Sequence, residues 1–253
     1  MIGGPGGGLK ILVVRVESFI DTPMPRILHV ADIHARQPWM DWIMGHAPGF
    51  DLLCIAGDLQ DAFAPAGMHA QAKALRPWLL QLPIPTIVCT GNHDWWPEDE
   101  RARDVYAEGG WIRMLAGKGC IVAVDGYVGN IGPLSLAVVG WNQPPVWRAG
   151  TDIVVCHSPP AGVIGPNSEE HGSREAEIRS AILVNPPRLY LCGHIHWPRQ
   201  RWCRLPGGSR QTLALNPGCD LEAGEPSCWD IDTDAGRAIW RGPSAEIIEV
   251  PLT

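Results

Sequence analysis

The sequence predicts an α/β fold in which two mixed sheets pack face to face and helices cover their outer surfaces. Short apolar runs rich in β-branched residues alternate with helical patterns through most of the chain, as is typical of α/β proteins. Between Cys120 and Trp141, and again after Thr212, strand patterns follow one another with no helix between them. Turn sequences at Asp125-Gly126 and at Asp234–Gly236 fit such strand-rich regions.

The same patterns place the individual elements along the chain. Strands are expected at Arg26–Ala31, Asp51–Ala56, Thr86–Cys89, Ile121–Val124, Leu134–Val139, Asp152–Cys156, Arg188–Leu191, Gln211–Leu215 and Cys228–Asp232. Helices are expected at Trp39–Gly45, Met68–Gln81, Glu98–Glu108 and Ser173–Val184.

The chain has 253 residues and a mass of 27.5 kDa, enough to bury a sizeable core. It contains no internal repeat and no obvious linker, so residues 24–253 are expected to form a single domain. Residues 1–23 have two interpretations. They are an upstream extension, since Met24 would be a natural start for the first core strand, or Ile11–Ile20 adds an edge strand. Charged residues interrupt this segment, which makes it a poor signal peptide.

Composition and charge argue against several classes of protein. Hydrophobic residues make up 45% and charged residues 19% of the chain, unlike a disordered protein. The formal net charge is −7 and the isoelectric point is about 5.7, so we do not expect a nucleic-acid partner. No stretch approaches the roughly 20 apolar residues of a membrane span, so we expect no membrane partner either.

The eight cysteines show no paired CxxC spacing. Cys54, Cys89, Cys156 and Cys192 lie within apolar runs, where a free cysteine behaves as a small buried hydrophobe. This usage predicts free thiols and a reducing, cytoplasmic location.

Polar side chains follow five of the expected strands. The segments are Asp32-Ile-His34, Gly57-Asp58, Gly91-Asn92-His93-Asp94, His157 and Gly193-His194-Ile-His196. Because ligand sites of open α/β sheets form at the carboxyl ends of strands, we expect these segments to converge. The glycines among them permit sharp turns and a close approach of the backbone.

The residue types in these segments suit divalent metals. Carboxylate oxygen, amide oxygen and imidazole nitrogen are all present and thiolate is not, a mixture suited to Mn, Fe or Zn. The candidate ligands are Asp32, His34, Asp58, Asn92, His157, His194 and His196. Seven ligands are too many for one ion and suit two ions if one carboxylate bridges them.

Five such segments in this order resemble the calcineurin-like metallophosphoesterase family, whose pattern is DxH, GD, GNHD, H and GHxH. The resemblance runs from Asp32 to His196 and implies a four-layer α/β/β/α sandwich with a two-metal centre. It assigns one ion to Asp32, His34 and His196 and the other to Asn92, His157 and His194, with Asp58 bridging both. A phosphoester is anionic, and two cations about 3.5 to 4 Å apart would neutralise its oxygens and acidify a bridging water, whose hydroxide is the expected nucleophile.

The leaving oxygen of the ester also needs a proton or another form of stabilisation. His93 is outside the metal shell that the resemblance implies, so we expect it to act as the general acid. Asp94 is expected to orient His93 and to favour its positively charged form.

The expected substrates are small phosphodiesters, with cyclic nucleotides among them. GNHD resembles the diesterases of the family more than the protein Ser/Thr phosphatases, and His157-Ser-Pro-Pro, His171-Gly-Ser and Asn216-Pro-Gly are similar to elements of small cyclic-nucleotide-type diesterases. A phosphomonoesterase and a nuclease are the alternatives. A non-catalytic scaffold is disfavoured, because none of the expected ligands is missing.

Other residues are candidates for substrate contact by their position beside these motifs. Trp95, Trp96 and Trp197 follow metal motifs directly, and His171 lies in a loop between two of them. Trp141 is a weaker candidate. Arg199, Arg201 and Arg204 either steer an anionic substrate or form a charged exposed loop, whereas His29, inside a strand, is expected to be structural. An exposed edge of the terminal strands could support a homodimer.

Overall fold

The computed structural model describes residues 25–94, 109–161, 173–198, 200–208, 210–243 and 246–252. The possible extension 1–23 and the expected helix Glu98–Glu108 lie outside the described residues. So do the substrate candidates Trp95, Trp96 and His171 and the basic residue Arg199.

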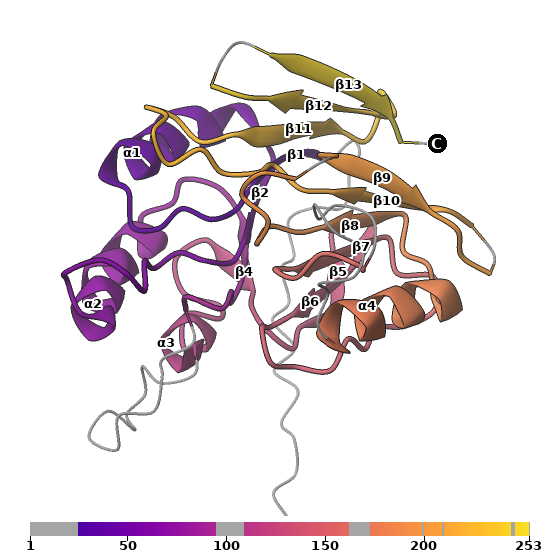
Figure 1. The fold of residues 1–253 in the computed structure, drawn as a ribbon, viewed down its shortest axis with the longest axis horizontal. Helices are drawn as coiled ribbons and strands as arrows, with labels where there is room; N and C mark the ends of the chain where they lie inside the picture. Colours follow the sequence, from indigo (N-terminus) through magenta and orange to yellow (C-terminus); the bar gives the residue numbers. More distant parts are fainter. Residues whose placement is uncertain are drawn as a thin grey trace, which may run out of the picture.

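Two mixed sheets form the centre of the molecule (Figure 1). The seven-stranded sheet has the order β13 (Ile247–Pro251), β12 (Arg237–Arg241), β11 (Cys228–Asp232), β1 (Arg26–Val30), β2 (Leu52–Ala56), β3 (Thr86–Cys89) and β4 (Ile121–Ala123). The six-stranded sheet has the order β5 (Val128–Ile131), β6 (Leu134–Val139), β7 (Ile153–Cys156), β8 (Leu189–Leu191), β10 (Thr212–Leu215) and β9 (Trp202–Leu205).

Helices cover the outer face of each sheet, as Figure 1 shows. They are α1 (Gln37–His46), α2 (Met68–Leu80), α3 (Gly110–Arg113) and α4 (Ser173–Val184), and a short 3-10 helix, η1 (Ala47–Gly49), follows α1. Three apolar clusters separate the layers. One lies between the sheets, one joins α1, α2 and α3 to the seven-stranded sheet, and one joins α4 to the six-stranded sheet. The predicted four-layer α/β/β/α sandwich is therefore confirmed.

Alternation along the strands explains this layering. In β1, Ile27 packs between the sheets, whereas Leu28 and Val30 pack under the helices. Successive side chains of a strand point to opposite faces, so a strand that is covered on both sides is apolar at nearly every position. The α-helices pack apolar side chains against the outer faces of the sheets, for example Ile43 of α1 and Ile178 of α4.

The nine expected strands all form, each within one residue of its predicted bounds. Four further strands, β5, β9, β12 and β13, were not predicted, nor was the single turn of α3. β5 contains glycine and asparagine and is half exposed, and β13 ends in proline. Such strands carry a weak apolar pattern, because one face or an edge meets solvent. β13 is an edge strand, in agreement with an exposed edge at the terminal strands.

The topology brings strand ends from both sheets to one place. β1, β2 and β3 run parallel in one sheet, and β7 and β8 run parallel in the other. Their carboxyl ends carry the five polar segments found in the sequence.

All eight cysteines are free, and only Cys120 is not buried. Among the helices of the described segments, none has the length and apolar character needed to cross a bilayer.

Candidate active site

The five polar segments converge where the two sheets meet. Backbone hydrogen bonds tie them together: the N–H groups of Asp32 and His34 donate to Gly57 and Asp58, each at 3.0 Å, and the Gly193 N–H donates to His157 at 3.0 Å. The predicted convergence of the loops is therefore observed.

The backbone of these loops is strained. Asp32, His34, Asp58 and His194 have φ values of 55°, 49°, 52° and 70°. Within the described residues, the only other non-glycine residue with positive φ is Ala35, in the same loop as His34. Left-handed backbone costs of order 1–3 kcal/mol per residue and tends to concentrate at functional sites. The strain here falls on four of the seven predicted ligands.

Two glycines are required by the close packing of the loops. A Cβ atom on Gly57, whose φ is 82°, would lie 2.6 Å from Nδ1 of His157. A Cβ atom on Gly91 would lie 2.1 Å from Oδ1 of Asp58. Any side chain at either position would displace a predicted ligand.

One half of the site contains His34, His196 and Asp32. The Nδ1–H of His34 donates to the carbonyl of Gln60 at 3.0 Å, which leaves the Nε2 lone pair free. That Nε2 faces Nε2 of His196 at 3.1 Å. Oδ1 of Asp32 lies 3.7 Å from the same His196 nitrogen.

The other half contains Asn92, His157 and His194. The Nδ1–H of His157 donates to the carbonyl of Ala56 at 2.7 Å, so its Nε2 atom points into the site. Oδ1 of Asn92 lies 3.1 Å from that nitrogen and 2.9 Å from Nδ1 of His194.

Asp58 lies between the two halves. Its Oδ2 is 3.2 Å from Nε2 of His157. It takes part in two groups of close ligand atoms, one with His157 and His194 and one with Asp32 and His34. This is the position that a bridging carboxylate requires.

Burial and charge set the pKa values of the site. Burial lowers the pKa of His34 and of His194 to about 4, so both rings are neutral at pH 7. Burial, reinforced by the Asp58 charge, raises the pKa of Asp32. Burial alone would lower the pKa of His157, but the carboxylates of Asp58 and Asp32 outweigh it and raise this pKa.

The donor set fits divalent cations. Imidazole nitrogens, an amide oxygen and two buried carboxylates point at one another, with N···N and N···O distances of 2.9–3.2 Å. A divalent cation would bind such a set through the lone pairs of its nitrogen and oxygen atoms. Asn92 is the member of the set that brings a neutral oxygen ligand.

His93 lies at the rim of the cluster with a fixed tautomer. Its Nδ1 accepts the backbone N–H of Ala62 at 3.0 Å, so the proton of the neutral ring is on Nε2. Its own backbone N–H donates to Oδ1 of Asp58 at 2.8 Å, and its Nε2 is 4.0 Å from Oδ2. The ring packs edge-on against His34, with centroids 4.7 Å apart. His93 thus presents an N–H group beside the predicted metal cluster.

Asp94 has partners other than the one that the sequence analysis expected. Its buried carboxylate accepts backbone N–H groups from Leu59, Gln60 and Gly91 at 2.9–3.3 Å, and the polar contacts of the His93 ring involve Ala62 and Asp58 instead. Burial, with the Asp58 charge, raises the pKa of Asp94. Its contacts join the loops after β2 and β3, so the expected role of orienting His93 is corrected to one of holding these two loops together.

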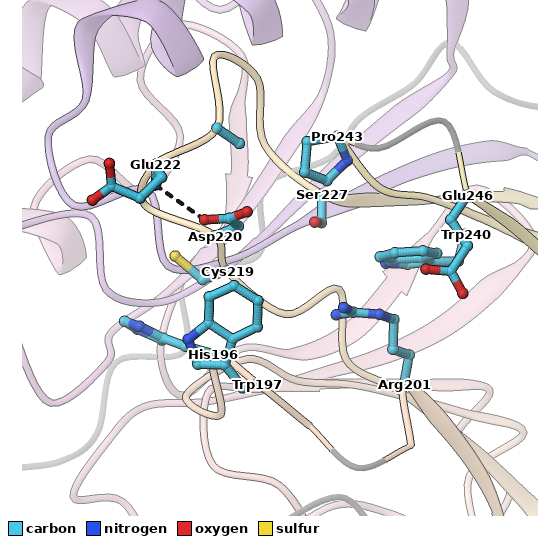
Figure 2. Close-up of a pocket in the computed structure, with 11 residues that line it drawn as sticks. His196, Trp197, Arg201, Cys219, Asp220, Glu222, Ser227, Trp240, Pro243 and Glu246 are labelled. Carbon is cyan, nitrogen blue, oxygen red and sulfur yellow. Dashed lines mark hydrogen bonds between the residues drawn. The ribbon is translucent and has the colours of Figure 1, made fainter.

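A pocket of about 410 Å³ opens beside His196 (Figure 2). Figure 2 shows His196 and Trp197 on one side of the pocket and Arg201 with Trp240 on the other. Trp197 is 66% exposed, and the Arg201 guanidinium lies 4.0 Å from the centroid of the Trp240 ring. Three carboxylates, those of Asp220, Glu222 and Glu246, also line the pocket. Its lining therefore offers both stacking and hydrogen-bonding surfaces next to the cluster.

Further aromatic side chains flank the cluster. Phe63 is 88% exposed, and its ring centroid lies 5.4 Å from that of His93. The Trp141 ring lies 5.2 Å from His194 and 5.7 Å from His157, so this weaker candidate does border the site.

The remaining candidates have structural positions. His29 is fully buried in β1, and its Nε2–H donates to the carbonyl of Cys192 at 3.1 Å. Arg204 belongs to strand β9 and donates to the carbonyl of Pro251, and Arg201 is half-buried against Trp240. Arg204 therefore lies in a strand and not in a loop, whereas Arg201 lies in the loop before β9 and is only partly exposed.

Three residues near the cluster were missed by the sequence analysis. The Cys219 thiol lies within 4.8 Å of ligand atoms of His34 and His196, and the Asp61 carboxylate lies within the same distance of His34 and His93. Phe63 is the third. Asp61 and Phe63 follow Asp58 within five residues, but Cys219 has no motif that marks it. Only the fold brings it to the site.

Comparisons with known proteins agree with this fold and identify the family. The sequence profile of the calcineurin-like phosphoesterase family matches residues 25–198, which include every predicted metal ligand. Members of this family typically bind divalent metals, and the described residues contain candidate clusters for them. No curated protein sequence gives a significant match.

Solved structures share the architecture at low sequence identity. The protein TT1561 of Thermus thermophilus is 13% identical, with a TM-score of 0.54 over 91% of this chain and 100% of that chain. The purple acid phosphatase PPD1 from yellow lupin (Lupinus luteus) seeds is 12% identical, with a TM-score of 0.56 over 88% of this chain and 52% of that chain. These likenesses concern the fold. The profile match over most of the chain shows that the protein belongs to the calcineurin-like phosphoesterase family and supports a hydrolase acting on phosphoesters.

Proposed function

We propose that the protein hydrolyses small phosphodiesters, cyclic nucleotides among them, at the cluster between the two sheets. The observation that carries this proposal is the presence of two surfaces for organic groups beside the cluster. Phe63 lies beside His93, and the pocket with Trp197 lies beside His196. An acyclic phosphodiester carries two organic groups on one phosphate, and a cyclic nucleotide joins both ester oxygens to one nucleoside. A monoester carries one organic group through one oxygen.

The chain offers a complete donor set for two divalent ions. Asp32, His34 and His196 would hold one, Asn92, His157 and His194 would hold the other, and Asp58 would bridge them. When bound, such ions neutralise phosphate oxygens and supply a water-derived nucleophile at neutral pH. Ligand types of this kind suit Mn, Fe or Zn.

His93 is proposed as the general acid. The Ala62 N–H occupies Nδ1 of His93 and thereby leaves the proton on Nε2, on the side of Asp58. In this tautomer the Nε2–H would donate a hydrogen bond to a leaving oxygen within reach and stabilise the charge that develops as the P–O bond breaks. Transfer of the proton itself requires a second proton on Nδ1, which displaces the Ala62 N–H. Phe63, packed edge-on against His93, offers an apolar face to the departing alcohol or phenol.

The pocket beside His196 is proposed to take the second organic group. Trp197 offers a face for stacking, while Arg201 and the carboxylates of Asp220 and Glu222 offer hydrogen bonds to a polar ring. A nucleobase has both a π-face and a polar edge, so a nucleotide diester matches this lining. A substrate of that size fits a site volume of about 410 Å³.

Two further parts of the proposal concern context. Eight free thiols agree with a reducing, cytoplasmic location. The exposed edge of β13 could pair with a second copy, which would give a homodimer.

The test is a kinetic comparison of matched esters in the metal-loaded protein. We expect a higher kcat/KM for an aryl phosphodiester than for the corresponding aryl monoester. For a cyclic nucleotide, Trp197→Ala is expected to raise KM with a smaller change in kcat. Trp42→Ala, which alters a tryptophan stacked on His46 of α1, is the matched control. Preference for the monoester would refute the diester assignment. Equal KM values in the Trp197→Ala variant and the wild type would refute the role of the pocket beside His196.

A further inference from the structure

We propose that Cys219 is a sulfur ligand of the metal position formed by His34 and His196. This inference rests on the proposed metal centre and adds a ligand to it. It changes the chemistry of that position, because the donor set found in the sequence contains oxygen and nitrogen only.

The geometry places the sulfur with the two imidazoles. The Sγ atom of Cys219 and ligand nitrogens of His34 and His196 all lie within 4.8 Å of one another. Cys219 is 2% exposed, and its Sγ lies 3.5 Å from the carbonyl oxygen of Asp32. Within the described part of the chain, Cys219 is the only cysteine in such a group of ligand atoms.

Backbone contacts hold Cys219 against the loop that carries His196. The Cys219 N–H donates to the His196 carbonyl at 2.8 Å. The preceding Gly218 has φ of 71°, and a Cβ atom there would lie 3.0 Å from the same carbonyl.

Asn216 fixes the other end of this turn. Its Nδ2 donates to the Gly193 carbonyl at 2.7 Å, and its Oδ1 accepts the Gly218 N–H at 2.7 Å. Asn216 is fully buried, so both contacts are protected from solvent. The sulfur is thus held beside His196 by the turn that follows β10, and no large movement is needed to bring it to an ion.

A sulfur ligand alters which metals the site prefers. Thiolate is a soft ligand and selects Zn and other thiophilic ions, whereas Mn and Mg prefer oxygen. The thiol loses its proton to solvent as the sulfur–metal bond forms. The two metal positions therefore differ, and the position with Cys219 is the more thiophilic.

Cobalt(II) provides a readout that is independent of catalysis. Titration of the full-length, metal-free protein with Co²⁺ should produce ligand-field absorption from ions held by histidine and carboxylate. It should also produce a sulfur-to-cobalt charge-transfer band in the near ultraviolet. Cys219→Ser should abolish the charge-transfer band, and the ligand-field absorption should remain. Cys219→Asp, which keeps a ligand of another kind, should behave in the same way.

Cys228→Ser is the matched control, because Cys228 is also 2% exposed but lies in β11. It should retain the charge-transfer band. In competition titrations, Cys219→Asp should lower the preference for Zn²⁺ over Mn²⁺ by at least tenfold relative to the wild type.

The outcomes separate the two proposals. Ligand-field absorption with no charge-transfer band in the wild type would overturn the role of Cys219 and leave the metal centre intact. A band that persists in both Cys219 variants would overturn it as well. A folded protein that binds no Co²⁺ or Zn²⁺ would overturn the metal centre and the sulfur ligand together.

Discussion

The backbone N–H of His194 donates to both carboxylate oxygens of Asp32, at 3.1 Å each, and this contact joins the end of β8 to the end of β1. The two strands belong to different sheets. The candidate metal cluster therefore lies across the seam between the sheets. A ligand that binds the cluster therefore contacts residues from both sheets and stabilises the packing of one sheet against the other.

Metal binding should for this reason stabilise the whole domain. Addition of Mn²⁺ or Zn²⁺ to metal-free protein is expected to raise Tm, because a ligand that binds only the folded state adds about 2.7 kcal/mol at 100 times its Kd. Thermal unfolding followed by circular dichroism measures the effect. In Asp58→Ala, which removes the proposed bridging ligand, the increase in Tm should be much smaller. An equal increase in this variant and the wild type would place the stabilising ion elsewhere.

Replacement of His93 should affect leaving groups unequally. His93→Gln is expected to lower kcat by about 10²- to 10⁴-fold for an alkyl ester, because the leaving oxygen then lacks its proton donor. An ester with a nitrophenyl leaving group depends less on a proton donor, because nitrophenolate is a stable anion, and should lose much less activity. The measurement is kcat across a series of leaving groups of increasing pKa. Metal content should be the same in both proteins.

A uniform loss of activity across that series would contradict the role of His93 as an acid. It would indicate instead that the substitution disturbs Asp58, whose Oδ1 accepts the His93 backbone N–H.

Asp94 should matter for stability as well as for activity. In Asp94→Asn the amide cannot accept from Leu59 and Gln60 on one side and from Gly91 on the other, because one of its two ends is now a donor. At least one buried backbone N–H loses its partner, which costs about 1–3 kcal/mol. Urea unfolding of the metal-free protein tests this value. Asp41→Asn, an exposed change on α1, should alter stability by less than about 0.5 kcal/mol.

His29 should contribute to acid sensitivity. Burial lowers the pKa of His29 from 6.5 to about 4, so the folded protein keeps this ring neutral while the unfolded chain takes up a proton below pH 6.5. The resulting stability is present above pH 6.5 and is lost as the pH falls towards 4. At pH 5 the loss amounts to about 2 kcal/mol relative to pH 7.

The variant His29→Leu isolates this effect. The free energy of unfolding of His29→Leu minus that of the wild type, both measured in urea, should rise by about 2 kcal/mol when the pH is lowered from 7 to 5. The exposed His46→Leu on α1 provides the comparison. A difference between wild type and His29→Leu that stays constant with pH would show that His29 is not the titrating group.

Much of the site could be predicted because its information is local in sequence. Each predicted ligand follows an apolar strand, and the parallel arrangement of those strands makes their carboxyl ends meet. The buried strands carry strong patterns, since both of their faces are covered. The half-exposed strand β5 and the edge strand β13 are not covered in this way, so their apolar patterns are weak and did not predict them.

Tertiary contacts could not be predicted in the same way. Cys219 follows the His196 motif by more than twenty residues, and only the turn after β10 returns it to the site. Asp94 is adjacent to His93 in sequence, but its carboxylate accepts hydrogen bonds from the loops after β2 and β3. Neighbouring positions in a turn can point in different directions, so sequence adjacency did not establish a contact.

The most direct test of the central claim is the hydrolysis of an aryl phosphodiester by metal-stripped protein, measured as Mn²⁺ is added back and bound metal is quantified. A two-metal centre predicts no turnover in the stripped protein and a return of turnover in step with bound metal, up to two ions per chain. Equal turnover with and without metal would contradict it. So would a folded protein that holds two ions and cleaves neither the diester nor its monoester counterpart.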